Sequence, residues 1–429
     1  MNFRFAAPLR AVLLALAASP AAAVDVSVSG FGTIGYARSN QPYTYQRFID
    51  NGGTFKRDSL LGLQLDAKLT ERVGATVQVK AAPSVSNDNR YAATISWAFL
   101  SYRPTNDWLL RAGKLRIPFY LYSENNDVGA TFDFARLPNE TYAMTPTTDF
   151  TGLSLSRSWG LHLGELTLDG FWGKAKTDIR FWVRDNFPPR FSAGPLFWGF
   201  NFEGEGLALT LKRDEDTYRV GLGQGVIKPR DGVPVPQSFP FVTLLPGIGY
   251  YQIDPSQPGP GLPTTTRINF TDIRLGAEVN LPAGMRVISE YVRRIVRNTD
   301  IGPDTTAAYA SLLKRIGKWT PYITYAFLRS EPGPRNLYTS VNYNTVPAFI
   351  PLAARINASQ RAAADMIVAF DQSSWALGTS YSLSPTSKIK AEYMRVHIGQ
   401  MSSLVDAPPR GDVRNQDINV LSLSYNFVF

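Results

Sequence analysis

The chain ends on the stretch Asp417-Ile418-Asn419-Val420-Leu421-Ser422-Leu423-Ser424-Tyr425-Asn426-Phe427-Val428-Phe429. Every second residue from Leu421 to Phe429 is apolar or aromatic, whereas Ser422, Ser424 and Asn426 hold most of the other parity. Because successive side chains of a strand point to opposite faces, this stretch predicts a strand with one apolar face and one small, polar face. The apolar face needs cover, either from a second sheet or from lipid.

The beginning of the chain has the pattern of an export signal. Arg4 and Arg10 accompany a short apolar run over residues 11–18, and Ala21 and Ala23 fit a small-residue cleavage site. This run is shorter than the ~20 residues that a spanning helix needs. We therefore expect a signal peptide over residues 1–23 and a mature domain over residues 24–429. The mature part has no apolar run of that length, so if it spans a membrane it does so as a barrel.

Composition limits the possible chemistry. Cys is absent and only two His are present, which excludes a disulfide framework and a thiolate metal site. Neither His162 nor His397 lies in a recognisable triad setting, so we expect no enzyme activity, no metal and no cofactor. The formal charge of +9 falls by two, to +7, when Arg4 and Arg10 are removed with the signal. The bases are scattered along the strands, which argues against a nucleic-acid partner.

The alternating pattern of the last stretch recurs along the mature chain. It gives about sixteen strands, with eighteen left open, at residues 25–37, 55–70, 73–80, 91–103, 108–116, 150–159, 164–175, 201–213, 217–228, 267–281, 285–297, 305–315, 319–329, 373–383, 388–397 and 416–429. Long and short links between these segments alternate nearly throughout. Short turns on one side and long loops on the other are typical of bacterial transmembrane barrels, whose strand number is even. The expected fold class is therefore all-β, a transmembrane antiparallel β-barrel.

The same parity predicts which side chains face lipid. Leu63, Val77, Trp375, Leu377 and Leu423 lie in mid-segment on the apolar parity, and their neighbours Gln64, Thr76 and Ser424 lie on the polar parity. Aromatic residues near the ends of apolar segments are expected to form interfacial girdles, namely Trp97, Trp108, Trp159, Trp172, Trp319, Trp375 and Tyr425.

At this point the chain from Asp25 to Phe429 resembles the sixteen-stranded general porins of Gram-negative bacteria, especially the proteobacterial type. The resemblance rests on the signal peptide, the opening strand Val-Ser-Gly-Phe-Gly-Thr-Ile-Gly-Tyr, the strand end Arg111–Arg116, the long third outer loop and the terminal Phe. It implies a homotrimer of water-filled channels in the outer membrane, surrounded by lipid, through which small hydrophilic solutes diffuse. It also implies that the barrel-assembly machinery reads the C-terminal strand.

In the porin family the third outer loop folds into the barrel and narrows it, and residues 117–149 match that loop here. The familiar Pro-Glu-Phe-Gly-Gly loop tip is not visible; Gly129 and Asp133-Phe134 are its partial counterparts. Family porins set an acidic loop against basic residues of the facing wall. The predicted constriction therefore consists of Glu124, Asp127, Asp133 and Glu140 with Lys80, Lys114 and Arg116, and the further predicted lumen charges are Lys68, Arg274, Arg286, Arg294, Lys388 and Lys390.

This charge distribution predicts a transverse field across the constriction and a weak preference for anions. Three functions stay open at this point: a passive diffusion porin, a solute-selective barrel for phosphate, organic acids or oligosaccharides, and a surface adhesin or structural barrel. A ladder of aromatic side chains in the lumen would favour sugars, and Tyr322 alone lies convincingly on the polar parity.

Overall fold

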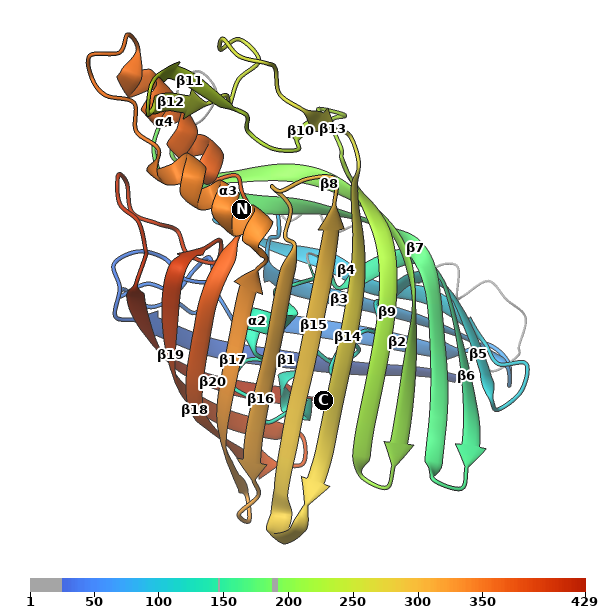
Figure 1. Cartoon of the computed structure of the whole chain (residues 1–429). Helices are drawn as coiled ribbons and strands as arrows, with labels where there is room; N and C mark the ends of the chain where they lie inside the picture. The colour runs from blue at the N-terminus through green and yellow to red at the C-terminus, as the bar shows by residue number, and fades with distance from the viewer. Residues whose placement is uncertain (1–24, 146, 187–191) are drawn as a thin grey trace, which may run out of the picture.

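The computed structural model describes residues 25–145, 147–186 and 192–429, so the predicted signal peptide and its cleavage site lie outside the described residues. Sixteen antiparallel strands form one closed barrel, in which β9 pairs with β14 and β20 pairs back to β1 (Figure 1). The predicted count of sixteen is confirmed. The barrel strands are β1(Asp25–Ser39), β2(Leu60–Lys68), β3(Val73–Pro83), β4(Tyr91–Tyr102), β5(Trp108–Arg116), β6(Asp149–Leu161), β7(Gly164–Val183), β8(Gly194–Arg213), β9(Asp216–Pro229), β14(Ile268–Leu281), β15(Met285–Arg297), β16(Thr305–Lys314), β17(Trp319–Ser330), β18(Phe370–Ser384), β19(Ser387–Ser402) and β20(Gln416–Val428).

The closing stretch completes the barrel against the first strand. Leu423 of β20 lies opposite Tyr36 of β1, and the backbones of Gly30 and Phe429 exchange hydrogen bonds of 2.8 and 2.9 Å. The side chain of Ser424 is buried on the lumen side, whereas that of Leu423 is 53% exposed on the outer side. The alternation of this stretch therefore separates the lumen from the exterior, and pairing with β1 leaves no free edge.

The outer face of the barrel is apolar. Leu63, Trp375, Leu377 and Leu423 are at least half exposed, as the alternation predicts, and Val77 is partly exposed. An exposed apolar band of this extent is uncharacteristic of a soluble monomer. Inside, polar side chains bond across neighbouring strands. The amide of Gln64 donates to Asp66 at 2.7 Å, and the hydroxyl of Thr76 donates to the same carboxylate at 2.6 Å.

One predicted girdle residue, Trp97, is on the opposite face. A β-bulge in β4 shifts the register, because Val79 lies opposite Ile95 whereas the preceding residue Gln78 lies opposite Trp97. An extra residue of this kind reverses the parity of everything beyond it. Trp97 therefore shares the lumen side with the buried Gln78, and its ring lies 5.9 Å from that of Phe99.

The outer end of the barrel is more elaborate than the alternation predicts. β7 and β8 continue as a long hairpin beyond the predicted ends at residues 175 and 201. The link after β9 holds two small sheets, made by β10(Val235–Pro236) with β13(Thr264–Thr265) and by β11(Phe241–Leu245) with β12(Ile248–Tyr251). The link after β17, predicted to be a loop, contains α3(Pro332–Tyr343) and α4(Ala353–Ala364). Figure 1 shows these elements together above one side of the barrel mouth.

Residues 117–148, which we call the inserted loop, enter the barrel between β5 and β6. They contain η1(Gly129–Thr131) and α2(Asn139–Tyr142), and Figure 1 shows α2 inside the barrel. Aromatic residues of the loop pack on lumen side chains, so that Phe134 lies 5.3 Å from Tyr322 and 6.3 Å from Tyr309, measured between ring centroids. No helix in the described ranges is both long and apolar enough to cross a membrane. The three-residue turn η2(Pro282–Gly284) joins β14 to β15 at the other end.

Candidate pore constriction

The inserted loop is held to the barrel wall at several points around the lumen. The first attachment is Asp127, whose carboxylate accepts a hydrogen bond of 2.7 Å from Lys80 of β3 and another from Arg116 of β5. Burial alone would raise the pKa of the Asp127 carboxyl, but Lys80 and Arg116 outweigh this effect and lower its pKa to about 2. The carboxylate is therefore ionised at neutral pH and links two wall strands to the loop.

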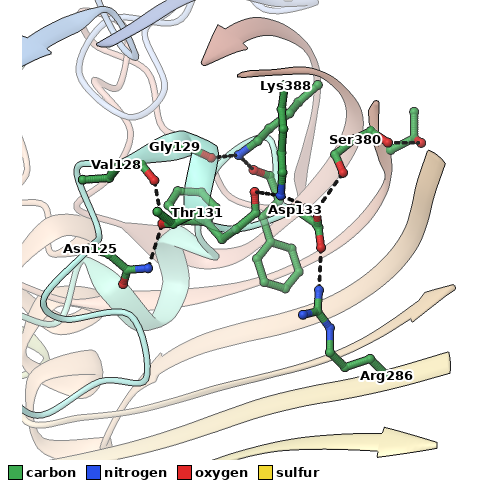
Figure 2. A network of polar contacts seen from close by, with 12 residues as sticks. Asn125, Val128, Gly129, Thr131, Asp133, Arg286, Ser380 and Lys388 are labelled. Atoms are coloured by element: carbon green, nitrogen blue, oxygen red, sulfur yellow. Dashed lines mark hydrogen bonds and ion pairs between the residues drawn. The ribbon is translucent and has the colours of Figure 1, made fainter. Parts of the chain in front are cut away.

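The second attachment is Asp133, shown in Figure 2. One carboxylate oxygen accepts hydrogen bonds of 2.8 Å from both Ser380 of β18 and Lys388 of β19. The other oxygen faces Arg286 of β15 at 2.5 Å. Burial opposes ionisation, yet Lys388 and Arg286 hold the pKa of the Asp133 carboxyl below its usual value. Because these strands lie on different parts of the wall, the loop crosses the lumen.

Between these two carboxylates, Lys390 binds the loop backbone. Its ammonium group donates to the carbonyls of Gly129 at 2.6 Å and Phe134 at 2.7 Å, and lies 4.0 Å from the centre of the Phe132 ring. Gly129 also lies close to the wall, since a Cβ atom there would lie 2.0 Å from the side-chain oxygen of Asn426. A larger residue at this position would require the Asn426 side chain to move, which is a packing reason for Gly129, one of the two partial counterparts of the family loop tip.

Wall carboxylates form further attachments, and these are not among the residues expected from the sequence. Glu290 accepts hydrogen bonds from the hydroxyls of Tyr142 at 2.7 Å and Tyr309 at 2.8 Å, and from the backbone of Leu121 at 2.9 Å. Glu278 accepts from Tyr122 at 3.0 Å. Only basic wall residues are predicted from the sequence, yet the alternation that places Arg286 and Arg294 in the lumen also places Glu290 there.

The remaining predicted constriction residues have separate surroundings. Glu124 is the most exposed loop carboxylate, with 57% of its side chain accessible, and it pairs with Arg111 at 3.3 Å. Glu140 is buried and accepts a hydrogen bond of 3.0 Å from Gln372, away from the predicted bases. Lys114 pairs with Asp149 at 2.7 Å, at the base of the loop.

The other predicted lumen charges divide into two groups. Arg274 and Arg294 share Asp272, with nitrogen–oxygen distances of 2.8 Å, and all three are buried. Lys68 lies at the end of β2 opposite the outer loops and pairs with Glu71 at 3.0 Å.

The loop carboxylates Asp127 and Asp133 are both in direct contact with basic residues of the wall. Each of these two carboxylates has two basic partners, so the opposite charges lie in contact at both points, and the transverse field across the constriction stays a prediction.

A cavity of about 570 Å³, lined by both charged and apolar side chains, lies against the inserted loop and the first outer loop. Its charged lining consists of Arg47, Arg57, Asp58, Asp127, Arg136, Arg180 and Arg274. The direct ion-pair partners of these residues are Asp88, Asp272, Asp406, Lys80 and Arg116. Together these are seven basic and five acidic side chains, so the cavity has an excess of positive charge. We call it the arginine cavity.

This architecture, a closed sixteen-stranded barrel with an apolar exterior and a loop folded into a polar lumen, is that of outer-membrane porins. No protein-family model matches the chain, and no curated protein matches its sequence. Solved structures do match. The outer-membrane channel DcaP of Acinetobacter baumannii is 12% identical with a TM-score of 0.51, covering 95% of this chain and 97% of its own.

Two further structures have the same overall path. The anion-selective porin from Comamonas acidovorans is 12% identical, with a TM-score of 0.50 and coverage of 95% of this chain and 100% of its own. OprB of Pseudomonas putida is 9% identical, with a TM-score of 0.52 and coverage of 98% of this chain and 96% of its own. The expected resemblance to porins is therefore confirmed at the level of the fold.

Proposed function

We propose that this protein is a porin-type channel of the bacterial outer membrane, through which small hydrophilic solutes and ions diffuse. The observation that carries the proposal is the arginine cavity of about 570 Å³ beside the inserted loop, inside a barrel whose exterior is apolar. Lumen carboxylates and bases are attached to the loop rather than arranged for catalysis. We propose no enzyme activity, no metal and no cofactor.

The excess of basic side chains around the arginine cavity supports a weak preference for anions. A wall of charge of one sign lowers the barrier for the opposite ion. Screening acts over ~8–10 Å at physiological salt, so the preference should be strongest at low salt. Among the predicted residues, Lys80, Arg116, Asp127 and Asp133 set the shape of the constriction through the loop attachments, and Glu124 acts on passing ions.

The surroundings of the channel follow from the same proposal. Residues 1–23 direct export, the exposed apolar band contacts outer-membrane lipid, and three copies assemble as in the porin family. The C-terminal strand is read by the barrel-assembly machinery. The apolar exterior around the whole barrel supports lipid contact, and the terminal Phe429 supports recognition during assembly.

Conductance in planar bilayers tests the proposal. Purified, heat-modifiable protein is added to a bilayer in KCl, first at equal concentrations and then across a gradient. Stepwise, ohmic conductance increments and a reversal potential on the anion side are expected, with the anion preference fading as salt rises. Correctly folded protein that inserts without conductance would overturn the channel and favour the adhesin or structural barrel. A reversal potential on the cation side would overturn the anion preference alone.

A further inference from the structure

A second, larger cavity lies under the outer elements. Its volume is about 810 Å³, and it is bordered by the outer parts of β7 and β8, the link after β9 and the segment that follows α4. Its lining is mainly apolar, with Phe181, Phe200, Ile301, Met366 and Val368 among the side chains that form it. A channel that passes only small hydrophilic solutes has no need of such a cavity. Its volume is within the range of sites that enclose small organic ligands.

Several polar groups bordering this apolar cavity are already bonded. The indole N–H of Trp182 donates to the carbonyl of Ala407 at 2.9 Å, and that of Trp198 donates to Asp231 at 3.0 Å. Asp178 is paired with Arg230 at 3.1 Å. A sugar would lose many hydrogen bonds to water here and obtain few replacements, which is costly. The surface therefore suits an apolar group.

The apolar cavity adjoins the arginine cavity. Ala143, Arg180, Ser403 and Leu404 line both of them. A molecule with its apolar part in the outer cavity can therefore place a charged end among the arginines below. The apolar cavity lies under the outer elements at the barrel mouth, and the arginine cavity lies against the inserted loop.

Arg274 offers the donors that such a charged end requires. Within the described ranges, its Nε and Nη1 atoms are buried and have no hydrogen-bond partner, while one Nη2 contact of 2.8 Å goes to Asp272. The guanidinium lies 4.3 Å from the ring centre of Phe119 and 4.4 Å from that of Tyr120, which fix its plane. Nη1 of Arg136, in the inserted loop, likewise has no hydrogen-bond partner among the described residues. A carboxylate is the planar anion that matches a guanidinium.

We infer that the two adjoining cavities bind an organic carboxylate with an apolar, hydrocarbon or aromatic body, the body in the apolar cavity and the carboxylate at Arg274. This inference rests on the proposed channel function and specifies one class of solute for it. Recognition needs both parts, because the apolar cavity provides the contact area and the arginine cavity provides the charge.

The probe for the test is 4-phenylbutyrate, with acetate and 4-phenylbutanol as comparators. Acetate has the charge without the apolar body, and 4-phenylbutanol has the body without the charge. Binding to the full, detergent-solubilised protein is measured by calorimetry, and block of the KCl current is measured in bilayers. We expect 4-phenylbutyrate to bind about tenfold or more tightly than either comparator, which corresponds to one charged hydrogen-bonded contact or one buried hydrocarbon group.

Two variants and one control separate the contributions. Arg274→Gln removes the guanidinium while Asp272 keeps Arg294 as a partner, and it should weaken 4-phenylbutyrate about tenfold without weakening 4-phenylbutanol. The near-isosteric double change Met366→Gln with Val368→Thr makes the apolar cavity polar and should weaken both. Arg329→Gln, on the outer face with 61% of its side chain exposed, is the control and should change neither.

The outcomes are distinguishable. Equal binding of acetate and 4-phenylbutyrate, or of 4-phenylbutanol and 4-phenylbutyrate, overturns the inference, as does unchanged binding in both variants. KCl conductance without the probe is recorded for each protein. Conductance without 4-phenylbutyrate binding contradicts only the inferred solute, whereas binding without conductance contradicts only the channel.

Discussion

Carboxylates that are equivalent in the sequence of the inserted loop differ in their surroundings. Glu124 has 57% of its side chain exposed, whereas Glu140 is 1% exposed and bonded to Gln372. Coulomb interactions with ions in the lumen are strong only for a charge that those ions approach. The two residues therefore provide a matched pair for testing which part of the loop faces the permeating ions.

We predict that Glu124→Gln shifts the reversal potential toward anions at low salt and that Glu140→Gln leaves it unchanged. The physical reason is that only Glu124 repels anions from the aqueous path. A KCl gradient across a planar bilayer measures both variants under the same conditions. A shift in Glu140→Gln as large as that in Glu124→Gln would place the aqueous path elsewhere.

The pKa of about 2 at Asp127 makes the attachment of the loop pH-dependent. A carboxyl whose pKa is lower in the folded than in the unfolded state stabilises the fold above its unfolded pKa of about 3.9, and this contribution is lost as pH falls through the folded value. We predict that Asp127→Asn lowers the free energy of unfolding by about 2 kcal/mol at pH 7 and that this difference disappears between pH 4 and pH 2.

Heat-modifiable gel mobility and tryptophan fluorescence, followed at pH 7, 4, 3 and 2, measure this difference between wild type and variant. Glu124→Gln is the matched control, because Glu124 is exposed and its loss should cost much less at every pH. A difference that stays constant from pH 7 to pH 2 would show that ionisation of Asp127 does not hold the loop.

At the scale of elements, the membrane-facing parts of the strands could be predicted well. Lipid on the outside and water on the inside require apolar and polar side chains to alternate along each strand. For this reason β15 has the predicted bounds and the closing strand has the predicted faces. Beyond the membrane this demand ends, and the outer parts of β7 and β8 carry runs such as Phe181-Trp182 that do not alternate. α4 depends on alanine content and packing, which a period-two pattern cannot reveal.

Part of the candidate site could be predicted for the same reason. Lys80 contacts Asp127, and Lys388 contacts Asp133. The alternation of side chains predicts that these bases face the lumen, and the family resemblance predicts that the loop enters it. Which base meets which acid depends on the path of the loop, and nothing in strand periodicity encodes that path. The bulge that turns Trp97 inward is equally hidden, because a single extra residue leaves no compositional mark.

Substitutions at two adjacent residues of β2 test which face of the barrel wall contacts lipid. Leu63 is 50% exposed on the outer face, and Gln64 bonds to Asp66 in the lumen. We predict that Leu63→Lys costs ~2–4 kcal/mol of folding free energy in lipid vesicles, while Gln64→Lys costs much less because its ammonium stays in water beside Asp66. Urea titration of folding into vesicles measures both. Equal costs would indicate a two-sided soluble core instead of a transmembrane wall.

A substitution of Lys390 tests how firmly the inserted loop is held to the barrel wall. Its buried ammonium binds the carbonyls of Gly129 and Phe134. We predict that Lys390→Met, which keeps the hydrocarbon stem, lowers the free energy of unfolding by about 2 kcal/mol and raises open-channel current noise, because two buried hydrogen bonds to the loop backbone are lost. Lys68→Met is the control, since Lys68 is exposed and paired only with Glu71 in the described structure. Equal noise in the two variants would contradict a restraining role for Lys390.

At the scale of the whole molecule, the pairing of β20 with β1 closes the barrel. The backbone of Phe429 exchanges hydrogen bonds with Gly30, and its ring lies over Gly30, where a Cβ atom would approach it to 2.3 Å. The side chain itself is 63% exposed on the outer face and stacks on Phe427 at a centroid distance of 6.2 Å. The Phe429 ring is thus largely exposed in the closed barrel, whereas its backbone makes the closing hydrogen bonds.

We therefore predict that Phe429→Ala separates assembly in cells from stability in vitro. The variant keeps both backbone hydrogen bonds with Gly30 and loses only a partly buried ring, so refolding into vesicles should lose less than about 1.5 kcal/mol. In cells, the amount of heat-modifiable protein in the outer membrane should fall several-fold, because the machinery no longer finds the aromatic terminus. Leu421→Ala, at an exposed position of the same strand, is the control and should leave the cellular amount unchanged. If Phe429→Ala lowered refolding in vesicles as much as assembly in cells, the terminal ring would be a structural contact of the closed barrel and not a recognition signal.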